Sequence, residues 1–208
     1  MKKESSLRSI IVITAITLIA GLLLGLTHEV TAEPIKKQQE AARTRSSQAV
    51  FEDAASFEEI DISGDTEALS ALFEDNLLKN VRVNAVYRAL DASGAFLGFV
   101  IDSTSGEGYG GDVEIMAGIR EDTDPALNGI SFLQLSETAG MGMKAKDEPF
   151  FSQFKGLPAG DTILYTKSGK QAPEEIDAIS GCTITTSAVT DAVNAAIVAA
   201  GYYKEVEK

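Results

Sequence analysis

One uncharged stretch near the N-terminus constrains the fold of this chain more than any other feature. Ser9 to Thr27 contains 19 residues without a charged side chain, most of them Ile, Leu, Val, Ala and Thr. A helix needs about 20 apolar residues to cross the hydrocarbon core of a bilayer. The segment therefore predicts a single membrane-spanning helix that contacts lipid through residues 9–27 and anchors the rest of the chain.

A secretory signal peptide is the alternative for this segment. The start of the chain is basic, and Val30-Thr31-Ala32 resembles a small-residue cleavage site. The apolar run is longer than the usual core of a signal peptide, which favours a retained anchor. Basic residues flank the run on both sides, so charge alone leaves its orientation open.

The composition of the chain is that of a folded, acidic protein. Hydrophobic residues make up 44% of the chain and charged residues 24%, with a formal net charge of −13. Nucleic-acid binding requires a basic surface, so this charge argues against a nucleic-acid partner.

Cysteine and histidine each occur once, as Cys182 and His28. One cysteine excludes an intramolecular disulfide, and the pair cannot form a Cys/His zinc site or ligate an iron–sulfur cluster unaided. His28 lies at the end of the apolar segment, which removes Ser-His-Asp and Cys-His catalysis from the remainder. Cys182 has no histidine to deprotonate it, so a small buried residue is a better interpretation than a nucleophile. We expect a cofactor to supply the chemistry.

The sequence predicts three parts: a tail and anchor over residues 1–28, a polar helical stalk over 29–50 and one domain over 51–208. The domain pattern is α+β, with a mainly antiparallel sheet and flanking helices. Asp91-Ala92-Ser93-Gly94 predicts a hairpin turn between the first two strands. We expect helices over Glu67–Lys79, Glu148–Phe154 and Ile184–Ala200, and strands over Asn84–Leu90, Phe96–Ile101, Val113–Ile119 and Ile130–Leu135.

The start of the last helix is the first candidate site. Val189, Val193, Ile197 and Ala200 share one face, and Gly201 is expected as the C-terminal cap. The helix then begins near Thr183, after the turn Ser180-Gly181-Cys182. A helix N-terminus favours a phosphate, either resting there or esterified to Thr183. The alternative is structural, with Ser180 or Thr183 acting only as a helix cap.

Two glycine-rich loops are the other candidates. Gly106 to Gly111 contains Tyr109, which could stack on an aromatic ring, and Gly110, which permits close backbone approach. An ordinary hairpin loop is the alternative there. Glu137-Thr138-Ala139-Gly140-Met141-Gly142 combines tight glycines with the apolar Met141. Its alternative is a strand-to-helix connection whose acid caps the next helix.

Together these motifs resemble the FMN-binding domain family, and more narrowly the G subunits of Rnf electron-transport complexes. The C subunits of sodium-pumping NADH:quinone reductases are related. The resemblance rests on Gly108–Gly111, on Glu137–Gly142 and on Asp177–Thr185, in this order after an N-terminal anchor.

The resemblance implies that Thr183 carries FMN through a phosphoester bond made by a separate, magnesium-dependent flavin transferase that uses FAD. It implies an electron-transfer subunit of a complex that couples ferredoxin:NAD⁺ electron transfer to Na⁺ or H⁺ translocation, with the other Rnf subunits as partners. A covalent cofactor suits a domain outside the cytoplasm, which favours a cytoplasmic N-terminus in the cell membrane. The residues expected around the cofactor are Thr183, Ser180, Gly181, Cys182, Tyr109, Gly110, Glu137, Thr138, Gly140 and Met141.

A membrane-tethered module that binds a phosphorylated ligand or flavin non-covalently is the alternative function. It would use the same helix start, but it would not need the Thr183 hydroxyl. No catalytic acid, base or metal ligand is expected in either case.

Overall fold

A computed structural model describes residues 2–206 of the chain, with side chains from residue 8 onward. The chain divides into two compact units, one ending at Ala42 and the other beginning at Arg43. The first unit consists of most of helix α1 (Lys2–Val50), and the second contains every other element.

Helix α1 contains both the predicted anchor and the predicted helical stalk. Two described helices are long and apolar enough to cross a membrane, one within Arg8–Val50 and one over Thr183–Val206. The apolar side chains of α1 between Ile10 and Leu26 are exposed, whereas most of the second helix is buried in the domain. The second helix is therefore accounted for as a core helix.

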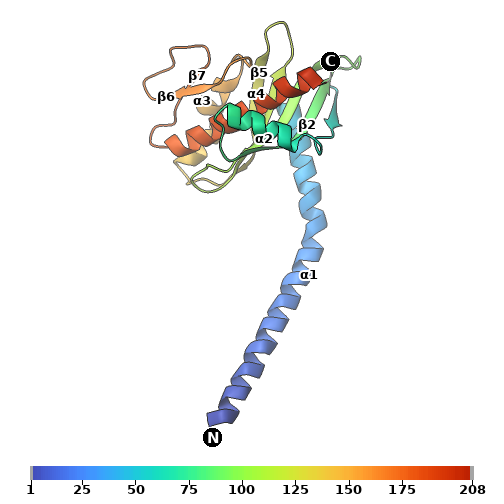
Figure 1. Ribbon diagram of the computed structural model, residues 1–208, viewed down its shortest axis with the longest axis vertical. Helices are drawn as coiled ribbons and strands as arrows, with labels where there is room; N and C mark the ends of the chain where they lie inside the picture. The colour runs from blue at the N-terminus through green and yellow to red at the C-terminus, as the bar shows by residue number, and fades with distance from the viewer. Residues whose placement is uncertain (1, 207–208) are drawn as a thin grey trace. The chain divides into compact units, whose positions relative to one another are not determined.

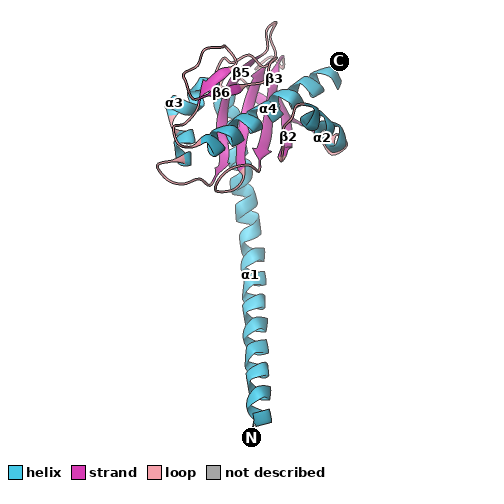
Figure 2. Cartoon of the chain, turned by 60° about the vertical axis from the view of Figure 1, so that its left-hand side comes forward, coloured by secondary structure: helices cyan, strands magenta, loops and turns pink. Residues whose placement is uncertain are grey.

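A five-stranded antiparallel sheet forms the centre of the second unit (Figures 1 and 2). Its strands follow chain order: β1 (Ser56–Ile60), β2 (Val81–Leu90), β3 (Phe96–Ser105), β4 (Val113–Arg120) and β5 (Ala126–Leu135). The α+β architecture and the four predicted strands are confirmed. Strand β1 was not predicted, because its sequence Ser-Phe-Glu-Glu-Ile lies at the sheet edge and lacks an apolar alternation.

The predicted hairpin turn between β2 and β3 is also confirmed. Gly94 has φ of 82° and donates its N–H to the Asp91 carbonyl. The Asp91 carboxylate accepts hydrogen bonds from the N–H groups of Ser93 and Ala95. These local bonds explain why the sequence alone predicts the turn.

Helices α2 (Thr66–Asp75) and α4 (Thr183–Val206) lie against one face of the sheet, with α4 crossing it (Figures 1 and 2). The predicted apolar face of α4 is buried throughout. The expected cap at Gly201 is wrong, because the helix continues to Val206. Tyr202 and Tyr203 donate hydrogen bonds to the Asp65 carboxylate, and Tyr203 is almost fully buried, which stabilises the extra turn.

The opposite face of the sheet packs against the end of α1. Val50 and Phe51 are buried with Val100 and Met116 in an apolar cluster on this face. A Cβ at Gly118 would lie 2.8 Å from the Val50 carbonyl oxygen, so only glycine permits this approach. The compact unit therefore begins within the stretch expected as stalk.

Short elements complete the unit beside the sheet. The predicted helix over Glu148–Phe154 is formed by α3 (Glu148–Phe151) and the 3₁₀ helix η2 (Ser152–Phe154), preceded by a second 3₁₀ helix, η1 (Gly142–Lys146). Strands β6 (Leu164–Thr166) and β7 (Glu175–Asp177) pair in parallel. They contain three residues each, too few for the sequence pattern to predict them.

A buried carboxyl group lies where α1 meets the sheet. Asp102 on β3 has no exposed side-chain surface, and its Oδ2 lies 2.9 Å from Nε of Arg43. Asn84 donates a hydrogen bond of 2.7 Å to Oδ1. Burial raises the pKa of Asp102 to about 6, and the charge of nearby Glu114 adds to the rise, while Asn84 and Arg43 oppose it.

The first prediction concerns Asn194 of α4, which is buried and bonds both backbone groups of Ile163. Asn194→Ala leaves a buried N–H and a buried carbonyl without partners, so we expect the free energy of unfolding to fall by about 2–4 kcal/mol. Urea unfolding of the full chain in detergent measures this. Glu205→Ala, an exposed change on the same helix, is the control and should shift stability by less than about 0.5 kcal/mol. Equal losses of stability in the two variants would contradict a stabilising role for the Asn194 hydrogen bonds.

The second prediction concerns pH and Asp102. A carboxyl with a raised pKa binds a proton more tightly in the folded state, so its contribution to stability falls as pH rises from about 4 to about 6. Relative to Asp102→Asn, the wild-type chain should lose stability over this window. Urea midpoints across the window measure the difference.

Asp91 is the matched control of opposite sign. Hydrogen bonds from Ser93 and Ala95 lower the pKa of its exposed carboxyl. Relative to Asp91→Asn, the wild-type chain should lose stability as pH falls below the ordinary range of an aspartate. A parallel pH response in the two comparisons would contradict the raised pKa of Asp102.

Candidate functional site

Helix α4 begins at Thr183, as the sequence predicts. In the preceding turn the Cys182 N–H donates to the Ile179 carbonyl at 3.0 Å, and Gly181 has φ of 77°, which favours glycine. The Thr186 hydroxyl donates to the Cys182 carbonyl and accepts from the Ile179 N–H. Thr186 therefore holds the turn from inside the helix.

The hydroxyls of Ser180 and Thr183 take no part in holding the turn. Within residues 8–206 neither of them forms a hydrogen bond. The structural alternative, in which the Ser180 or Thr183 side chain caps the helix, is therefore not what the structure shows, because Thr186 holds the turn instead. Thr183 is partly exposed, and its hydroxyl is free to react or to bind a ligand.

The first turn of α4 also presents free backbone donors. Within the helix, the first backbone N–H that has an acceptor is that of Thr186, which donates to the Cys182 carbonyl. The N–H groups of Thr183, Ile184 and Thr185 have no acceptor among the described residues. Three free donors at the positive end of a 24-residue helix favour an anion beside Thr183.

The register of the sheet brings both glycine-rich loops to one end of it. Ser105 pairs with Val113, and Val113 pairs with Leu135, so the end of β3, the start of β4 and the end of β5 lie side by side. The Tyr109 N–H donates a hydrogen bond of 2.9 Å to Oε1 of Glu137. Glu137 thus joins the two loops and does not cap a helix.

A cavity of about 560 Å³ lies where these loops meet α4. Seven of the ten predicted residues line it: Tyr109, Glu137, Thr138, Met141, Gly181, Cys182 and Thr183. Tyr109 is 72% exposed and Met141 51% exposed, so large apolar side chains surround the opening. Cys182 is buried, as expected of a small residue that fills the turn.

Three predicted residues do not line this cavity. Ser180 lines a neighbouring one, while Gly110 and Gly140 shape the loops. A Cβ at Gly110 would lie 1.8 Å from the Ser136 carbonyl oxygen, so Gly110 lets the two loops touch. Gly140 has φ of 74° at the turn before η1.

Three lining residues are not among the ten site residues that the sequence predicts: Gly142, Ile184 and Thr185. Thr185 belongs to the run of hydroxyls after Thr183, but the sequence does not show which face of the helix lines the cavity. A Cβ at Gly142 would lie 2.6 Å from Oγ1 of Thr185, so this glycine brings the loop against α4.

The donor set of the cavity fits FMN. Tyr109, Met141 and Ile184 offer exposed apolar surface to a flat ring system. The Thr183 hydroxyl and the free N–H groups of the first helical turn suit a phosphate. The described residues contain no group of three or more His, Cys, Asp or Glu that could hold a metal ion.

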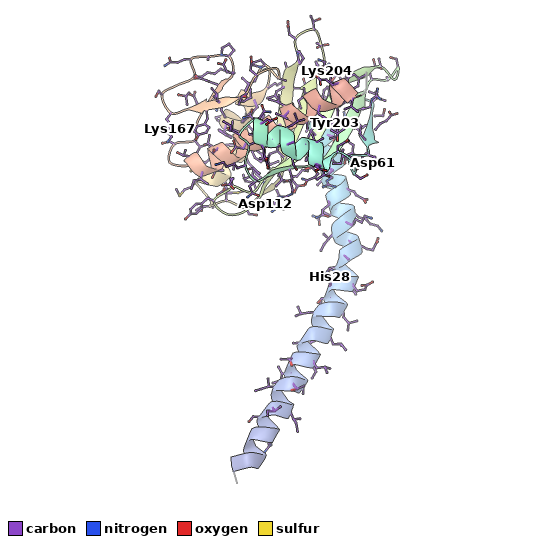
Figure 3. All side chains as sticks on the ribbon, in the orientation of Figure 1. His28, Asp61, Asp112, Lys167, Tyr203 and Lys204 are labelled. Carbon is purple, nitrogen blue, oxygen red and sulfur yellow. The ribbon has the colours of Figure 1, made fainter. Side chains whose placement is uncertain are left out.

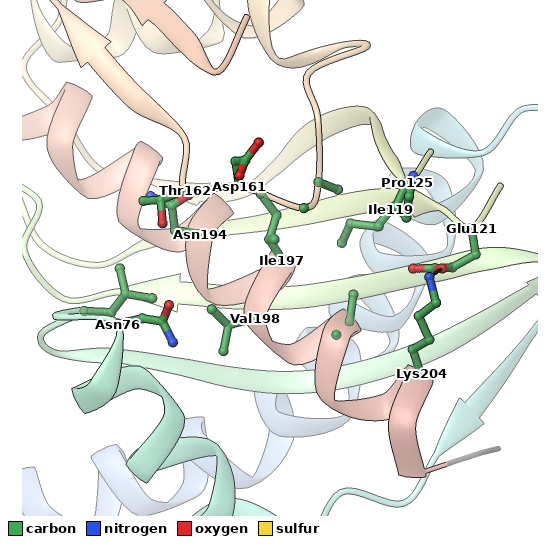
Figure 4. Close-up of a pocket in the computed structure, with 15 residues that line it drawn as sticks. Asn76, Ile119, Glu121, Pro125, Asp161, Thr162, Asn194, Ile197, Val198 and Lys204 are labelled. Carbon is green, nitrogen blue, oxygen red and sulfur yellow. Dashed lines mark ion pairs between the residues drawn. The ribbon is translucent and has the colours of Figure 1, made fainter. Parts of the chain in front are cut away.

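Another cavity, of about 320 Å³, lies along the C-terminal half of α4 and contains none of the predicted residues (Figure 4). Glu121 and Lys204 form an ion pair at its edge, and Asn194 is already bonded to Ile163. Most of its polar side chains therefore already interact with other groups of the domain. The cavity beside Thr183 is the better candidate for the functional site.

Comparison with known proteins agrees with this choice. The FMN-binding domain family matches residues 108–198, which include Tyr109, the Glu137–Gly142 loop and most of α4. The same fold occurs in a solved structure from Parabacteroides distasonis, that of the C subunit of the Na⁺-translocating NADH-quinone reductase. The TM-score is 0.52 at 21% identity, covering 79% of this chain and 92% of that one.

Two relatives are similar over nearly their whole length. The G subunit of the Na⁺-translocating ferredoxin:NAD⁺ oxidoreductase complex of Acetobacterium woodii is 31% identical, covering 90% of this chain and 87% of the relative. The G subunit of the ion-translocating oxidoreductase complex of Methanosarcina acetivorans is also 31% identical, covering 90% of both. The chain therefore belongs to the family of G subunits of ion-translocating oxidoreductase complexes, and its C-terminal part is an FMN-binding domain.

Proposed function

We propose that this chain is the covalently flavinylated electron-transfer subunit of a membrane-bound Rnf-type complex that couples ferredoxin:NAD⁺ electron transfer to Na⁺ or H⁺ translocation. The observation that carries the proposal is the free Thr183 hydroxyl at the edge of the 560 Å³ cavity, between free helical N–H groups and apolar side chains. Family membership supports the redox role and the other subunits of the complex as partners.

The cavity residues would bind and orient the cofactor. Bound FMN supplies one- and two-electron redox chemistry. Tyr109 and Met141 cover apolar ring surface, while Glu137 fixes the loop that presents Tyr109. Thr138 offers a hydroxyl at the cavity wall. No residue needs to act as an acid or base.

Attachment requires a separate flavin transferase. The Thr183 oxygen forms a bond to the FMN phosphorus of FAD, the bond from that phosphorus to AMP breaks, and AMP leaves. The proton of the Thr183 hydroxyl passes to a base on the transferase, because no histidine lies in the domain to accept it. The phosphodiester keeps one negative charge beside the helix N-terminus.

The chain is proposed to divide into a tail and anchor (1–28), a stalk (29–50) and an FMN domain (51–208). The exposed apolar surface of α1 supports an anchor in lipid through residues 9–27. We propose a single pass through the cell membrane, a cytoplasmic N-terminus and an extracytoplasmic FMN domain. A covalent tether supports this orientation, since a dissociated flavin would be lost outside the cytoplasm.

The third prediction tests the attachment residue. Thr183→Val, expressed with a flavin transferase, should remove covalent flavin completely, because the accepting oxygen is gone. Flavin fluorescence on a denaturing gel and the intact mass measure this. Ser180→Ala, which removes a neighbouring exposed hydroxyl, should remain labelled. A wild-type chain that carries flavin only before denaturation would support the non-covalent alternative instead.

The fourth prediction tests the link between the loops. Glu137→Ala removes the acceptor of the Tyr109 N–H. The contact between the two loops should then lose about 1–3 kcal/mol of stabilisation, and the cavity wall should loosen. The chain should still be flavinylated at Thr183, but its visible flavin absorption should shift toward that of free FMN. Glu137→Gln keeps an acceptor oxygen and should retain the native spectrum. Identical spectra for all three proteins would contradict a role for Glu137 at the cofactor.

A further inference from the structure

A second cavity, distinct from the one lined by Tyr109, also borders on Thr183. It measures about 340 Å³ and is lined by Lys167, Ala178, Ile179, Ser180, Gly181 and Thr183. Gly181 and Thr183 line both cavities, so Thr183 lies on the boundary between them. An atom bonded to the Thr183 oxygen therefore has access to either side.

The two cavities differ in charge. Glu137 is the ionisable carboxylate of the 560 Å³ cavity, and Lys167 is the one cationic side chain that lines either cavity within the described part of the chain. A phosphodiester is repelled by Glu137 and attracted by Lys167. The charges thus favour the apolar cavity for the flavin ring and the Lys167 cavity for the phosphate.

The small parallel sheet explains how Lys167 reaches this place. Thr166, the last residue of β6, pairs with Asp177, the last residue of β7. The Ala178 N–H donates to the Thr166 carbonyl at 2.8 Å. The chain therefore leaves β6 at Lys167 beside the segment that leads from β7 into Ser180. Figure 3 places Lys167 on the same side of the domain as the start of α4.

The loop after β6 is itself held in place by hydrogen bonds. The Ser168 N–H donates to Oγ1 of Thr166, and the Lys170 N–H donates to the Asp177 carboxylate at 2.7 Å. The Lys167 side chain is exposed, and no carboxylate of the described residues forms an ion pair with it. Its charge is available to a ligand.

We propose that Lys167 is a phosphate-binding residue of the flavin site: its ammonium neutralises the phosphodiester on Thr183 and the diphosphate of the incoming FAD. This inference rests on the proposed attachment of FMN to Thr183. It assigns a role to the β6–β7 sheet, which otherwise has none in the site.

The test combines substitution with flavinylation. Full-length wild-type, Lys167→Gln, Lys167→Arg and Lys170→Gln proteins are prepared without flavin and then incubated with FAD, Mg²⁺ and a flavin transferase. Lys170 is the matched control, since it lies in the same loop and lines neither cavity. The labelling rate is followed by gel fluorescence, and urea midpoints are measured for the labelled and unlabelled forms.

Lys167→Gln should be labelled about two- to fivefold more slowly than wild type, the size expected for a partly exposed charge pair. Labelling should also raise its urea midpoint less than it raises that of wild type, and the difference should shrink from about 0.05 M to about 0.5 M NaCl. Lys167→Arg and Lys170→Gln should behave as wild type.

Two results would overturn the inference. If Lys167→Gln and Lys170→Gln gain the same stability on labelling, Lys167 does not contact the phosphate, whatever the rates are. If wild type is labelled but only at a residue other than Thr183, or not at all, the proposed function fails and this inference fails with it. The intact mass and a Thr183→Val sample separate these two cases.

Discussion

The packing of α4 across the antiparallel sheet is the interaction on which the rest of the domain depends. Fourteen of its 24 residues are buried, and six of them are alanines, which let the helix lie close to the strands. Ser103 of β3 donates a hydrogen bond of 2.8 Å to the Ala192 carbonyl. Because sliding the helix would open this core, its N-terminus is held in a fixed position relative to the strands.

That fixed helix start lies next to the sheet end from which both glycine-rich loops emerge. Antiparallel register brings Ser105, Val113 and Leu135 together, although 30 positions separate the first from the last. Neither loop could form a cavity alone, since one supplies Tyr109 and the other supplies Glu137 and Met141. The site is therefore a product of the sheet register and the helix packing together.

Local patterns predicted much of this arrangement, and long-range contacts account for what they missed. The alternating strands, the Asp91 turn and the apolar face of α4 are encoded within a few residues and were found. The extension of α4 past Gly201 depends on Asp65, more than a hundred positions away, and could not be read locally. The same holds for Asp102, whose burial requires Arg43 from α1, and for Gly142, which only the folded loop brings against Thr185.

The hydrogen bonds around the turn give two threonines different roles: Thr186 holds the turn, and Thr183 keeps a free hydroxyl. Thr186 uses its hydroxyl as donor and acceptor to hold residues 179–182, so the helix start does not need the Thr183 hydroxyl. Esterification of Thr183 then breaks no hydrogen bond of the native fold. A transferase could act on the folded domain, and the flavin would enter a cavity already shaped by Glu137 and the loop glycines. Had Thr183 been the helix cap, modification would have cost about 1 kcal/mol of helix stability. Separating the two roles avoids that conflict.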